Sequence, residues 1–484
     1  MSKKLFDLWT KAWRRVNRPL RASNETAGAR PPSTDDQALS RALSLLDIEQ
    51  REQYRKLAEI IRARPSQFLY ELIPFKESLT KRVSLQEACQ ILRGLLSLPS
   101  ETTIEHLPVR SLLDVASAHA VTFRETATGG LPFTAQPPRV IGVGDQRPLE
   151  CVTRSLYVAC LPDAYVHGRS ALIEFRGSAV LDFQGAELEQ VDEHLILDLP
   201  VLQASKKDVW LATSRTNALR LNEGFNLLGP NTPQFGHWMW EYMPKYVAAV
   251  RSAKLSNVPI LIDAYMPATH REFLEMLLPP NAEVVEVPYN STVRVHRLWC
   301  AANLAYIPTY IKTLDPNWPA YEIPLPEHFA AVFSEITRRA GAVVPSKPGP
   351  ERIYLARKPD QLKKLVNYSA IEQCASEHGF YVFYPQDLTF AEQIQLMRGA
   401  RYIIGPEGSA LFLGFLARPA TKLCVVSSIH MFNATSYTCL LEAIGVDTTI
   451  FTGEVVNESK LYPHFADYRI SEEAFRAFLG EWLQ

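Results

Sequence analysis

The feature that most constrains the fold is an alternation of strand-like and helix-like segments between Glu351 and Val426. Short apolar runs alternate with stretches of amphipathic helical spacing; the runs read ERIYLAR, GFYVFYP, ARYIIG and KLCVV. Alternation of this kind predicts an α/β fold in which a parallel sheet is wound with helices. Such sheets bind ligands beyond the carboxyl ends of their strands. We therefore expect a binding site where these strands end.

A basic pair, Arg357 and Lys358, follows the first of these strands. Arginine offers a fixed fork for a phosphate, and lysine offers a mobile point charge. The pair is therefore a candidate for neutralising the diphosphate of a nucleotide. Lys363 and Lys364, one turn further on, are more simply explained as a solvated helix face.

A glycine-flanked acidic turn, Gly405 to Ala410, follows the third strand. Gly408 permits a tight turn, and Ser409 and Ala410 would present backbone N–H groups at a helix start, where anions bind. Glu407 would repel a phosphate, so we expect it to face a sugar or ribose hydroxyl or to take part in proton transfer. The turn is neither a Walker A loop nor a GxGxxG fingerprint.

A second alternating region, residues 205–335, precedes the first and predicts another α/β half. A Pro- and Gly-rich stretch, residues 340–350, separates the two, as expected of a hinge. Two sheets that face a cleft would suit an enzyme that holds a nucleotide donor on one half and an acceptor on the other.

The helix expected over residues 235–253 contains a second candidate site. His237 and Glu241 are four residues apart and would share one face. A carboxylate beside an imidazole can orient it, and either group could take a proton from a hydroxyl. The alternative is a buried histidine bonded to an acid in a tryptophan-rich core. Pro244 should kink this helix or end its first segment.

The chain before these halves divides into three parts. Residues 1–36 combine a basic stretch with an apolar-aromatic stripe, over residues 1–18, and a linker. Such a helix could touch a membrane surface, or simply dock on its own domain. Residues 37–135 are expected to form a helical appendage. Short β-rich runs from Arg139 onward lead into the N-terminal α/β domain of residues 139–340, and residues 350–484 form the C-terminal domain.

Composition narrows the function further. The net charge is −1, which gives no basic field for nucleic acid. The seven cysteines are scattered without CxxC pairs, which favours a reducing compartment and core packing. There is no 18-residue apolar run and no signal-peptide pattern. No HExxH or DxD motif appears, so no metal site is expected. Asp263, His296 and His430 are isolated and expected to be structural.

Several motifs occur in an order and spacing that match a known family. The helix contains His237, Trp238, Glu241 and Pro244, the first strand contains Tyr354 and Arg357, and residues 379–419 follow the family pattern, including Gln393 and the turn at Glu407. Over residues 140–455 the chain resembles glycosyltransferase family 61, which includes bacterial capsular polysaccharide biosynthesis proteins. Three positions depart from the pattern: Met243 replaces leucine, Tyr368 replaces an acid and Glu407 replaces histidine.

The resemblance implies a GT-B fold and an inverting, metal-independent transfer of a sugar from a nucleotide diphosphate donor. The donor, for example a UDP-sugar, would lie on the C-terminal half; no other cofactor is expected. Arg357, Lys358, Gln393 and the residues Gly408 to Ala410 are the expected substrate-binding groups. His237, Glu241 and Glu407 are the expected catalytic groups.

We therefore expect a bacterial enzyme in the cytoplasm, or peripheral at the inner face of the cytoplasmic membrane. Its acceptor would be a surface glycan or a lipid-linked precursor. One alternative is a non-catalytic protein of polysaccharide assembly that binds a sugar nucleotide or a glycan, which the departures at Tyr368 and Glu407 favour. A third alternative is a nucleotide-dependent epimerase, but the absence of a GxGxxG motif counts against it.

Overall fold

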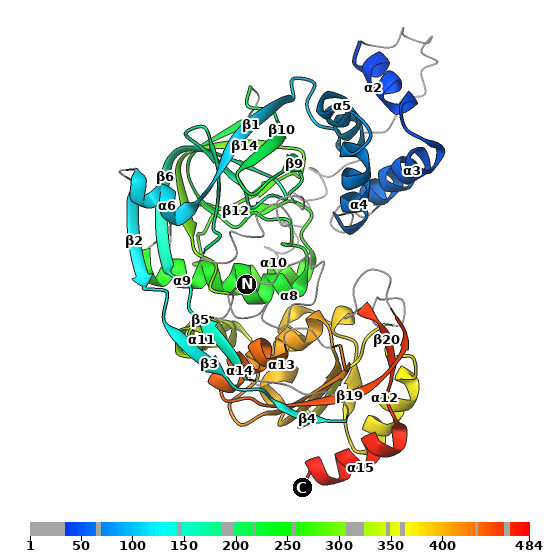
Figure 1. The fold of residues 1–484 in the computed structure, drawn as a ribbon. Coiled ribbons are helices and arrows are strands. Elements are labelled where there is room, and N and C mark those ends of the chain that lie inside the picture. The colour runs from blue at the N-terminus through cyan, green and yellow to red at the C-terminus, as the bar shows by residue number, and fades with distance from the viewer. Residues whose placement is uncertain are drawn as a thin grey trace, which may run out of the picture.

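The protein is a mixed α/β chain with two large sheets and a group of N-terminal helices (Figure 1). The computed structural model describes residues 34–63, 69–119, 121–142, 148–184, 198–216, 218–253, 255, 257–305, 324–344, 349–358, 364–430, 434–458 and 465–484. The basic stretch of residues 1–18, most of the linker and Lys363 lie outside the described residues.

The N-terminal helices are α2 (Thr34–Ser44), α3 (Ile48–Ala63), α4 (Leu69–Thr80) and α5 (Leu85–Leu96). Ser84 begins α5 with a capping box, since its hydroxyl accepts from the Glu87 N–H while the Glu87 carboxylate accepts from the Ser84 N–H. Their apolar faces form one cluster that also takes in Leu199 and Leu202 of the following half. The helical character predicted for residues 37–135 ends at Leu96.

The segment after these helices forms a strand that pairs with a neighbouring strand on each side. Strand β1 (Thr103–Ser111) is antiparallel to β10 (Asp208–Thr213) and parallel to β8 (Ser178–Leu181). A short helix, α6 (Leu112–Ala118), then leads to β2 (Thr122–Ala127), which pairs with β6 (Leu156–His167). Residues 103–127 are therefore part of the first large sheet.

The first large sheet forms the N-terminal half. Its strand order is β13-β12-β11-β14-β6-β7-β8-β1-β10-β9. The strands not yet given are β7 (Ile173–Phe175), β9 (Val201–Ala204), β11 (Leu219–Asn226), β12 (Ile260–Asp263), β13 (Val284–Val287) and β14 (Thr292–Ala301). Strands β11 to β14 are parallel, as the alternation in residues 205–335 predicts, while β6 is antiparallel to β14. The β-rich runs after Arg154 are therefore strands of this same large sheet.

The second large sheet forms the C-terminal half, in the order β16-β15-β17-β18-β19-β20. The strands are β15 (Arg352–Leu355), β16 (Tyr381–Phe383), β17 (Tyr402–Pro406), β18 (Lys422–Ser428), β19 (Asp447–Asn457) and β20 (Asp467–Arg469). The helices are α12 (Tyr368–Glu377), α13 (Phe390–Gly399), α14 (Ala434–Ala443) and α15 (Glu472–Trp482). All pairs from β16 to β19 are parallel, which confirms the predicted wound sheet.

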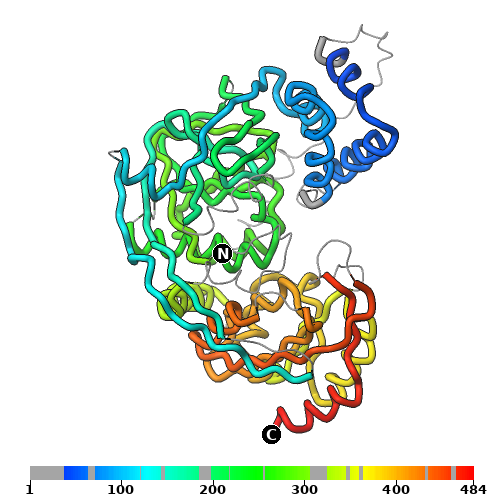
Figure 2. The backbone as a smooth tube through the Cα atoms, viewed as in Figure 1, coloured from blue at the N-terminus to red at the C-terminus, as the bar shows by residue number. Residues whose placement is uncertain are grey.

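The chain crosses between the halves before Leu156 (Figures 1 and 2). Strand β4 (Arg139–Ile141) adds to the C-terminal sheet, parallel to β19. A hairpin of β3 (Pro132–Ala135) and β5 (Leu149–Val152) lies beside it, and its Ala135 and Cys151 are buried in the core that contains Tyr437 of α14. The prediction that Arg139 onward belongs to the N-terminal half is therefore wrong for β4, because nothing in a three-residue apolar run identifies its pairing partner.

The two halves share a core centred on Trp240. Its indole ring packs 5.4 Å from Phe412, 5.5 Å from Phe415 and 6.0 Å from Phe329 of α11 (Pro326–Val343). All seven cysteines are buried and unpaired, in agreement with their expected role in core packing. In the described part of the chain, no helix is both long enough and apolar enough to cross a bilayer.

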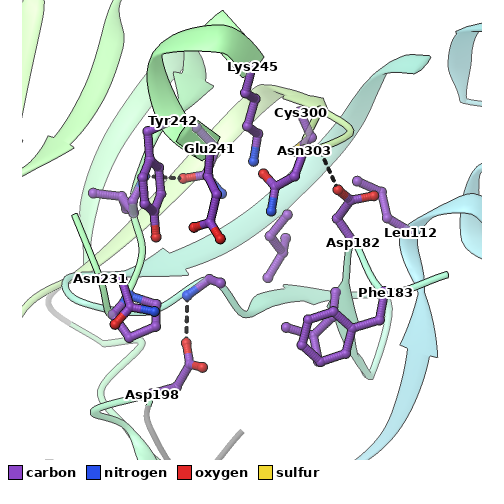
Figure 3. A pocket seen from close by; sticks show the side chains of 16 residues that line it. Leu112, Asp182, Phe183, Asp198, Asn231, Glu241, Tyr242, Lys245, Cys300 and Asn303 are labelled. Atoms are coloured by element: carbon purple, nitrogen blue, oxygen red, sulfur yellow. Dashed lines mark hydrogen bonds between the residues drawn. The ribbon is translucent and has the colours of Figure 1, made fainter. Parts of the chain in front are cut away.

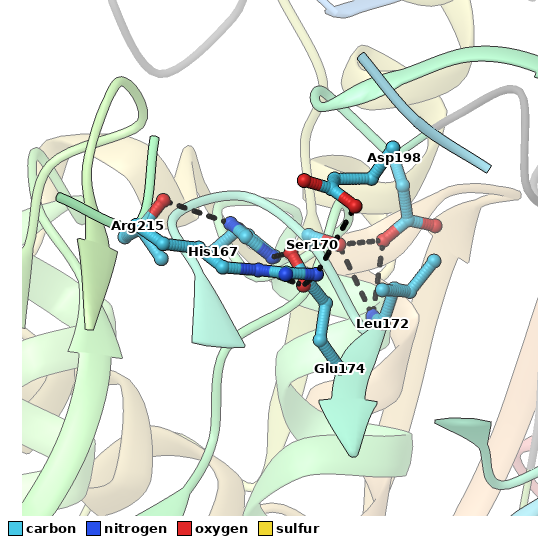
Figure 4. A network of polar contacts seen from close by, with 8 residues as sticks. His167, Ser170, Leu172, Glu174, Asp198 and Arg215 are labelled. Carbon is cyan, nitrogen blue, oxygen red and sulfur yellow. Dashed lines mark hydrogen bonds and ion pairs between the residues drawn. The ribbon is translucent and has the colours of Figure 1, made fainter. Parts of the chain in front are cut away.

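A buried ionic network braces the N-terminal half (Figure 4). Glu174 lies 2.8 Å from His167 Nε2 and accepts a 2.8 Å hydrogen bond from Arg215 Nε. Burial alone would raise the pKa of Glu174, but hydrogen bonds and charge from His167 and Arg215 outweigh it and lower that pKa to about 2. Nearby, Asp198 accepts 2.5 Å hydrogen bonds from the Ser170 hydroxyl and from the Ala171 N–H.

Candidate active site

One helical stretch of the N-terminal half contacts the C-terminal half at its first residues. It comprises α8 (Phe235–His237), the π-helical turn η2 (Trp238–Tyr242) and α9 (Met243–Ala253). Pro244 explains the π turn, since it lacks an N–H and its ring would clash with the carbonyl of Trp240. The wider turn, in which the Met243 N–H bonds to the Trp238 carbonyl, relieves both problems. Pro244 was predicted to kink the helix or to end its first segment. In the structure the first segment ends in a local π turn, and the α-helix then resumes.

His237 and Glu241 form the pair that their spacing predicts. His237 Nδ1 lies 3.1 Å from Glu241 Oε2, and the two side chains are 9% and 3% exposed. Trp238 and Trp240 are buried beside them, as the structural alternative also requires. A catalytic role for the pair is favoured because Glu241 lines a cavity, which is described below.

A pocket of about 230 Å³ lies where the chain leaves β15 and β17. We call it the turn pocket. The strand order reverses at β15, with β16 on one side and β17 on the other, so this is the topological switch point at which open α/β sheets bind ligands. The expected residues that line it are Arg357, Gln393, Gly408, Ser409 and Ala410, and the N-terminal half contributes Phe235 and Thr269.

Arg357 and Gly408 are fitted to each other. The Arg357 guanidinium donates from Nη1 to the carbonyl oxygen of Glu407 at 2.5 Å. A Cβ atom at position 408 would lie only 2.6 Å from that same nitrogen. The backbone of Gly408 is extended, so its conformation does not require glycine. Glycine is required here because the Arg357 guanidinium approaches so closely. Burial lowers the pKa of Arg357, yet a guanidinium remains charged at neutral pH.

The turn is followed by a helix start, as predicted, but the helix is of the tighter 3₁₀ type. It is η5 (Ser409–Leu416), and its first residues lie against the start of α8. A Cβ atom at Gly236 would lie 3.0 Å from the Phe412 ring and 3.3 Å from Ser409 Oγ. The turn and the helix that contains His237 are therefore in direct contact across the two halves.

Two expected residues, Glu407 and Lys358, have other surroundings, and a third, Gln393, lines the pocket while it also bonds to the backbone. The Glu407 carboxylate accepts a hydrogen bond from the hydroxyl of Ser427 in β18. Lys358 pairs with Asp387 at 2.7 Å and is 45% exposed. Neither Glu407 nor Lys358 is among the described residues that line the turn pocket or the cavity of Glu241. Gln393 does line the turn pocket, although its amide nitrogen donates to the Pro385 carbonyl at 2.7 Å.

Two motif residues belong to the packing. Tyr354 is fully buried in the core of the C-terminal half. Asn367 exchanges two hydrogen bonds with the backbone of Ile470, which fixes the start of α12 against the end of β20. Asp263 is likewise structural, since it accepts hydrogen bonds from Thr232 and from the Gly229 N–H.

A second pocket, of about 60 Å³, lies within the N-terminal half (Figure 3). We call it the Glu241 cavity. Its polar lining residues are Asp182, Asp198, Asn226, Asn231, Glu241, Tyr242, Lys245 and Asn303. Of these polar residues, only Glu241 was predicted from the sequence as a candidate functional residue. Only Lys245 had a usable signal, because it follows Glu241 by four residues and so shares its helix face.

Comparison with known proteins identifies one segment. Residues 235–424 match the family model described as Glycosyltransferase 61. The matched segment begins at the first residue of α8 and ends within β18, so it contains both the His237–Glu241 pair and the turn pocket. No curated protein matched the chain.

Proposed function

We propose that the protein transfers a sugar from a nucleotide diphosphate donor to a hydroxyl of a surface polysaccharide or its precursor, because residues 235–424 match the family model of glycosyltransferase 61. In this proposal the two α/β halves act as the two domains of a GT-B arrangement. The donor lies in the turn pocket, and the acceptor approaches from the N-terminal half. The reaction takes place near the inner face of the cytoplasmic membrane.

The turn pocket is suited to a diphosphate because Arg357, which follows β15, and Gly408 and Ser409, at the start of η5, all line it. A guanidinium fork binds phosphate oxygens in a bidentate manner, and the start of a helix adds a partial positive charge. These groups would stabilise the charge that develops on the leaving diphosphate. In our proposal they do so without a required divalent ion.

The transfer is a single displacement that inverts the anomeric centre. The acceptor oxygen attacks the anomeric carbon as the bond from that carbon to the diphosphate oxygen breaks, and the diphosphate leaves with the bonding electrons. Glu241 takes the proton of the attacking hydroxyl, and His237, 3.1 Å away, orients and supports the carboxylate. Glu407, tied to Ser427, holds the turn in place and takes no proton.

The observation that supports the proposal most strongly is the convergence of five expected residues in one pocket at the switch point of the C-terminal sheet. A thermal-shift screen across UDP-, GDP-, CMP- and dTDP-sugars tests it. Binding to the native state should raise its stability by about 2.7 kcal/mol at a hundredfold excess over Kd. Arg357→Ala should abolish the shift. Arg401→Ala, which removes an exposed arginine at the opposite end of β17, should keep it.

If none of these nucleotide sugars stabilises the wild-type protein, the proposal is wrong. A second candidate, a non-catalytic sugar-nucleotide or glycan binding protein, is favoured by one observation: Glu407, at the position of the family's histidine, bonds to Ser427. Stabilisation by a nucleotide sugar without any release of nucleoside diphosphate, with or without added glycan, would support this candidate.

A further inference from the structure

The Glu241 cavity contains two polar groups that have no partner in the described part of the chain. Lys245 enters it from the same helix as Glu241 and is 9% exposed, yet its ammonium makes no hydrogen bond or ion pair there (Figure 3). Asn303 Oδ1 is buried and also without a hydrogen-bond partner within the described residues. The cavity thus presents one donor group, the Lys245 ammonium with its three N–H bonds, and one acceptor atom, Asn303 Oδ1.

Unsatisfied groups of this kind are costly. Burial removes water from around the Lys245 ammonium and so lowers the pKa of that group. Native structures rarely leave buried polar atoms unpaired, so each such atom requires an explanation. A ligand that both donates and accepts hydrogen bonds would satisfy the two groups together, and a hydroxyl does both.

The charges around the cavity balance. Asp182 pairs with Arg154 at 3.2 Å. Lys76, buried in α4 of the N-terminal helices, donates to the Asp198 carbonyl at 2.9 Å and so neutralises that side of the cavity. Glu241 and Lys245 are the remaining residues of opposite charge in the lining. A charged ligand would bring an uncompensated charge into a buried site, whereas an uncharged ligand would not.

The size and the lining of the Glu241 cavity suit an uncharged ligand that carries several hydroxyl groups. A volume of about 60 Å³ accommodates roughly four to six water positions, which corresponds to one small ring with its hydroxyl groups. The polar residues face apolar ones across the cavity, including Leu112, Phe183 and Leu228. A sugar ring has the same two characters, hydroxyl groups at its rim and C–H groups on its faces.

We propose that the Glu241 cavity is the subsite for one uncharged monosaccharide unit of the acceptor, in which a ring hydroxyl bridges Lys245 Nζ and Asn303 Oδ1. This inference rests on the proposed function, since it places a second hydroxyl of the same sugar at Glu241. It assigns Lys245 and Asn303 as specificity-determining residues that favour neutral over acidic or amino sugars.

Saturation-transfer NMR with single sugars tests this proposal without turnover. The probes are the methyl glycosides of glucose, galactose, mannose and rhamnose at millimolar concentration, with glucuronate and glucosamine as charged probes. At least one uncharged glycoside should receive saturation from the wild-type protein. Lys245→Met and Asn303→Ala should each weaken its binding about tenfold or more. Lys422→Met, which removes a lysine of β18, should leave it unchanged.

Two results would overturn the subsite: no uncharged glycoside receives saturation, or its binding is the same in Lys245→Met and Asn303→Ala as in the wild type. Both variants should fold, because Lys245→Met keeps a long apolar stem and breaks no hydrogen bond in the described part of the chain, and Asn303→Ala keeps the backbone N–H that bonds to Asp182. Arg357→Ala separates the two proposals, since it should lose nucleotide-sugar binding and keep glycoside binding. Glycoside binding without any nucleotide-sugar binding would reject the transferase and retain the sugar site.

Discussion

The turn pocket and the Glu241 cavity are built in opposite ways. The turn pocket takes most of its walls from the last residues of β15 and β17 and the segments that follow them, so short runs of sequence encode it. The Glu241 cavity collects residues from Leu112 to Asn303, which lie on many elements and meet only in the folded chain. A site that a fold type dictates can be read from local sequence, whereas a site made by tertiary assembly is visible only in the structure.

The two sites also differ in electrostatics. Arg357 is the one charged residue among the described residues that line the turn pocket, and a guanidinium suits an anion. Around the Glu241 cavity carboxylates and cations offset each other, which suits an uncharged ligand. If the proposed function holds, one half would bind the charged donor and the other the neutral acceptor. Substitutions that affect one site and spare the other test this division.

The largest effect should come from Glu241→Gln. Removal of a general base costs about 10²–10⁴-fold in rate, so kcat should fall by that factor while the Kd for nucleotide sugar stays the same. Steady-state kinetics and calorimetric titration give the two quantities. Glu275→Gln, on the exposed face of α10 (Ala268–Leu277), is the matched control. Near-wild-type turnover in both Glu241→Gln and His237→Ala would reject the pair as the catalytic base.

Glu174→Gln should destabilise the half that holds the cavity. The native pKa of Glu174 is about 2, below its ordinary 4.5, so the charged form stabilises the fold above pH 4.5 and this stability is lost as pH falls toward 2. At pH 7 the variant should lose about 3 kcal/mol of unfolding free energy. Denaturant titrations at pH 7 and pH 3 should show that this difference shrinks in acid. An equal difference at both pH values would contradict the role of the His167–Glu174–Arg215 network.

Gly408→Ala should damage the turn pocket alone. The new methyl group would meet the Arg357 guanidinium and displace it, which should weaken nucleotide-sugar binding about tenfold to a hundredfold, the worth of a hydrogen bond to a charged group. Gly480→Ala, at a position where a Cβ atom meets nothing, is the control. An unchanged donor Kd in Gly408→Ala would show that Arg357 does not bind the donor in this position.

The smallest effect should come from Lys358→Met. Its ammonium forms an exposed ion pair with Asp387, and exposed pairs contribute about 0–1 kcal/mol. Calorimetric titration should therefore show a change of no more than a few-fold in donor affinity. A loss as large as that of Arg357→Ala would place Lys358 in direct contact with the diphosphate.

The comparison also explains what could be predicted from sequence. Residues 351–426 were assigned correctly because each strand ends at a turn or a helix cap, as Thr389 caps α13. The pairing of β1 and of β4 was missed, since both depend on distant strands. Lys245 was missed because a lysine in a helix normally faces solvent, and only its tertiary neighbours make it a buried cation.

Strand β4 has a consequence for how the protein is made. It pairs with β19, and Ile141 and Thr452, which are joined by a hydrogen bond, lie 311 residues apart. During synthesis from the N-terminus, β4 and its hairpin must wait, with their edges unpaired, until nearly the whole chain has been made. Contacts this distant in sequence form slowly. The C-terminal sheet is therefore complete only with a strand from the first third of the chain, and the nascent chain is most exposed to aggregation before β19 emerges.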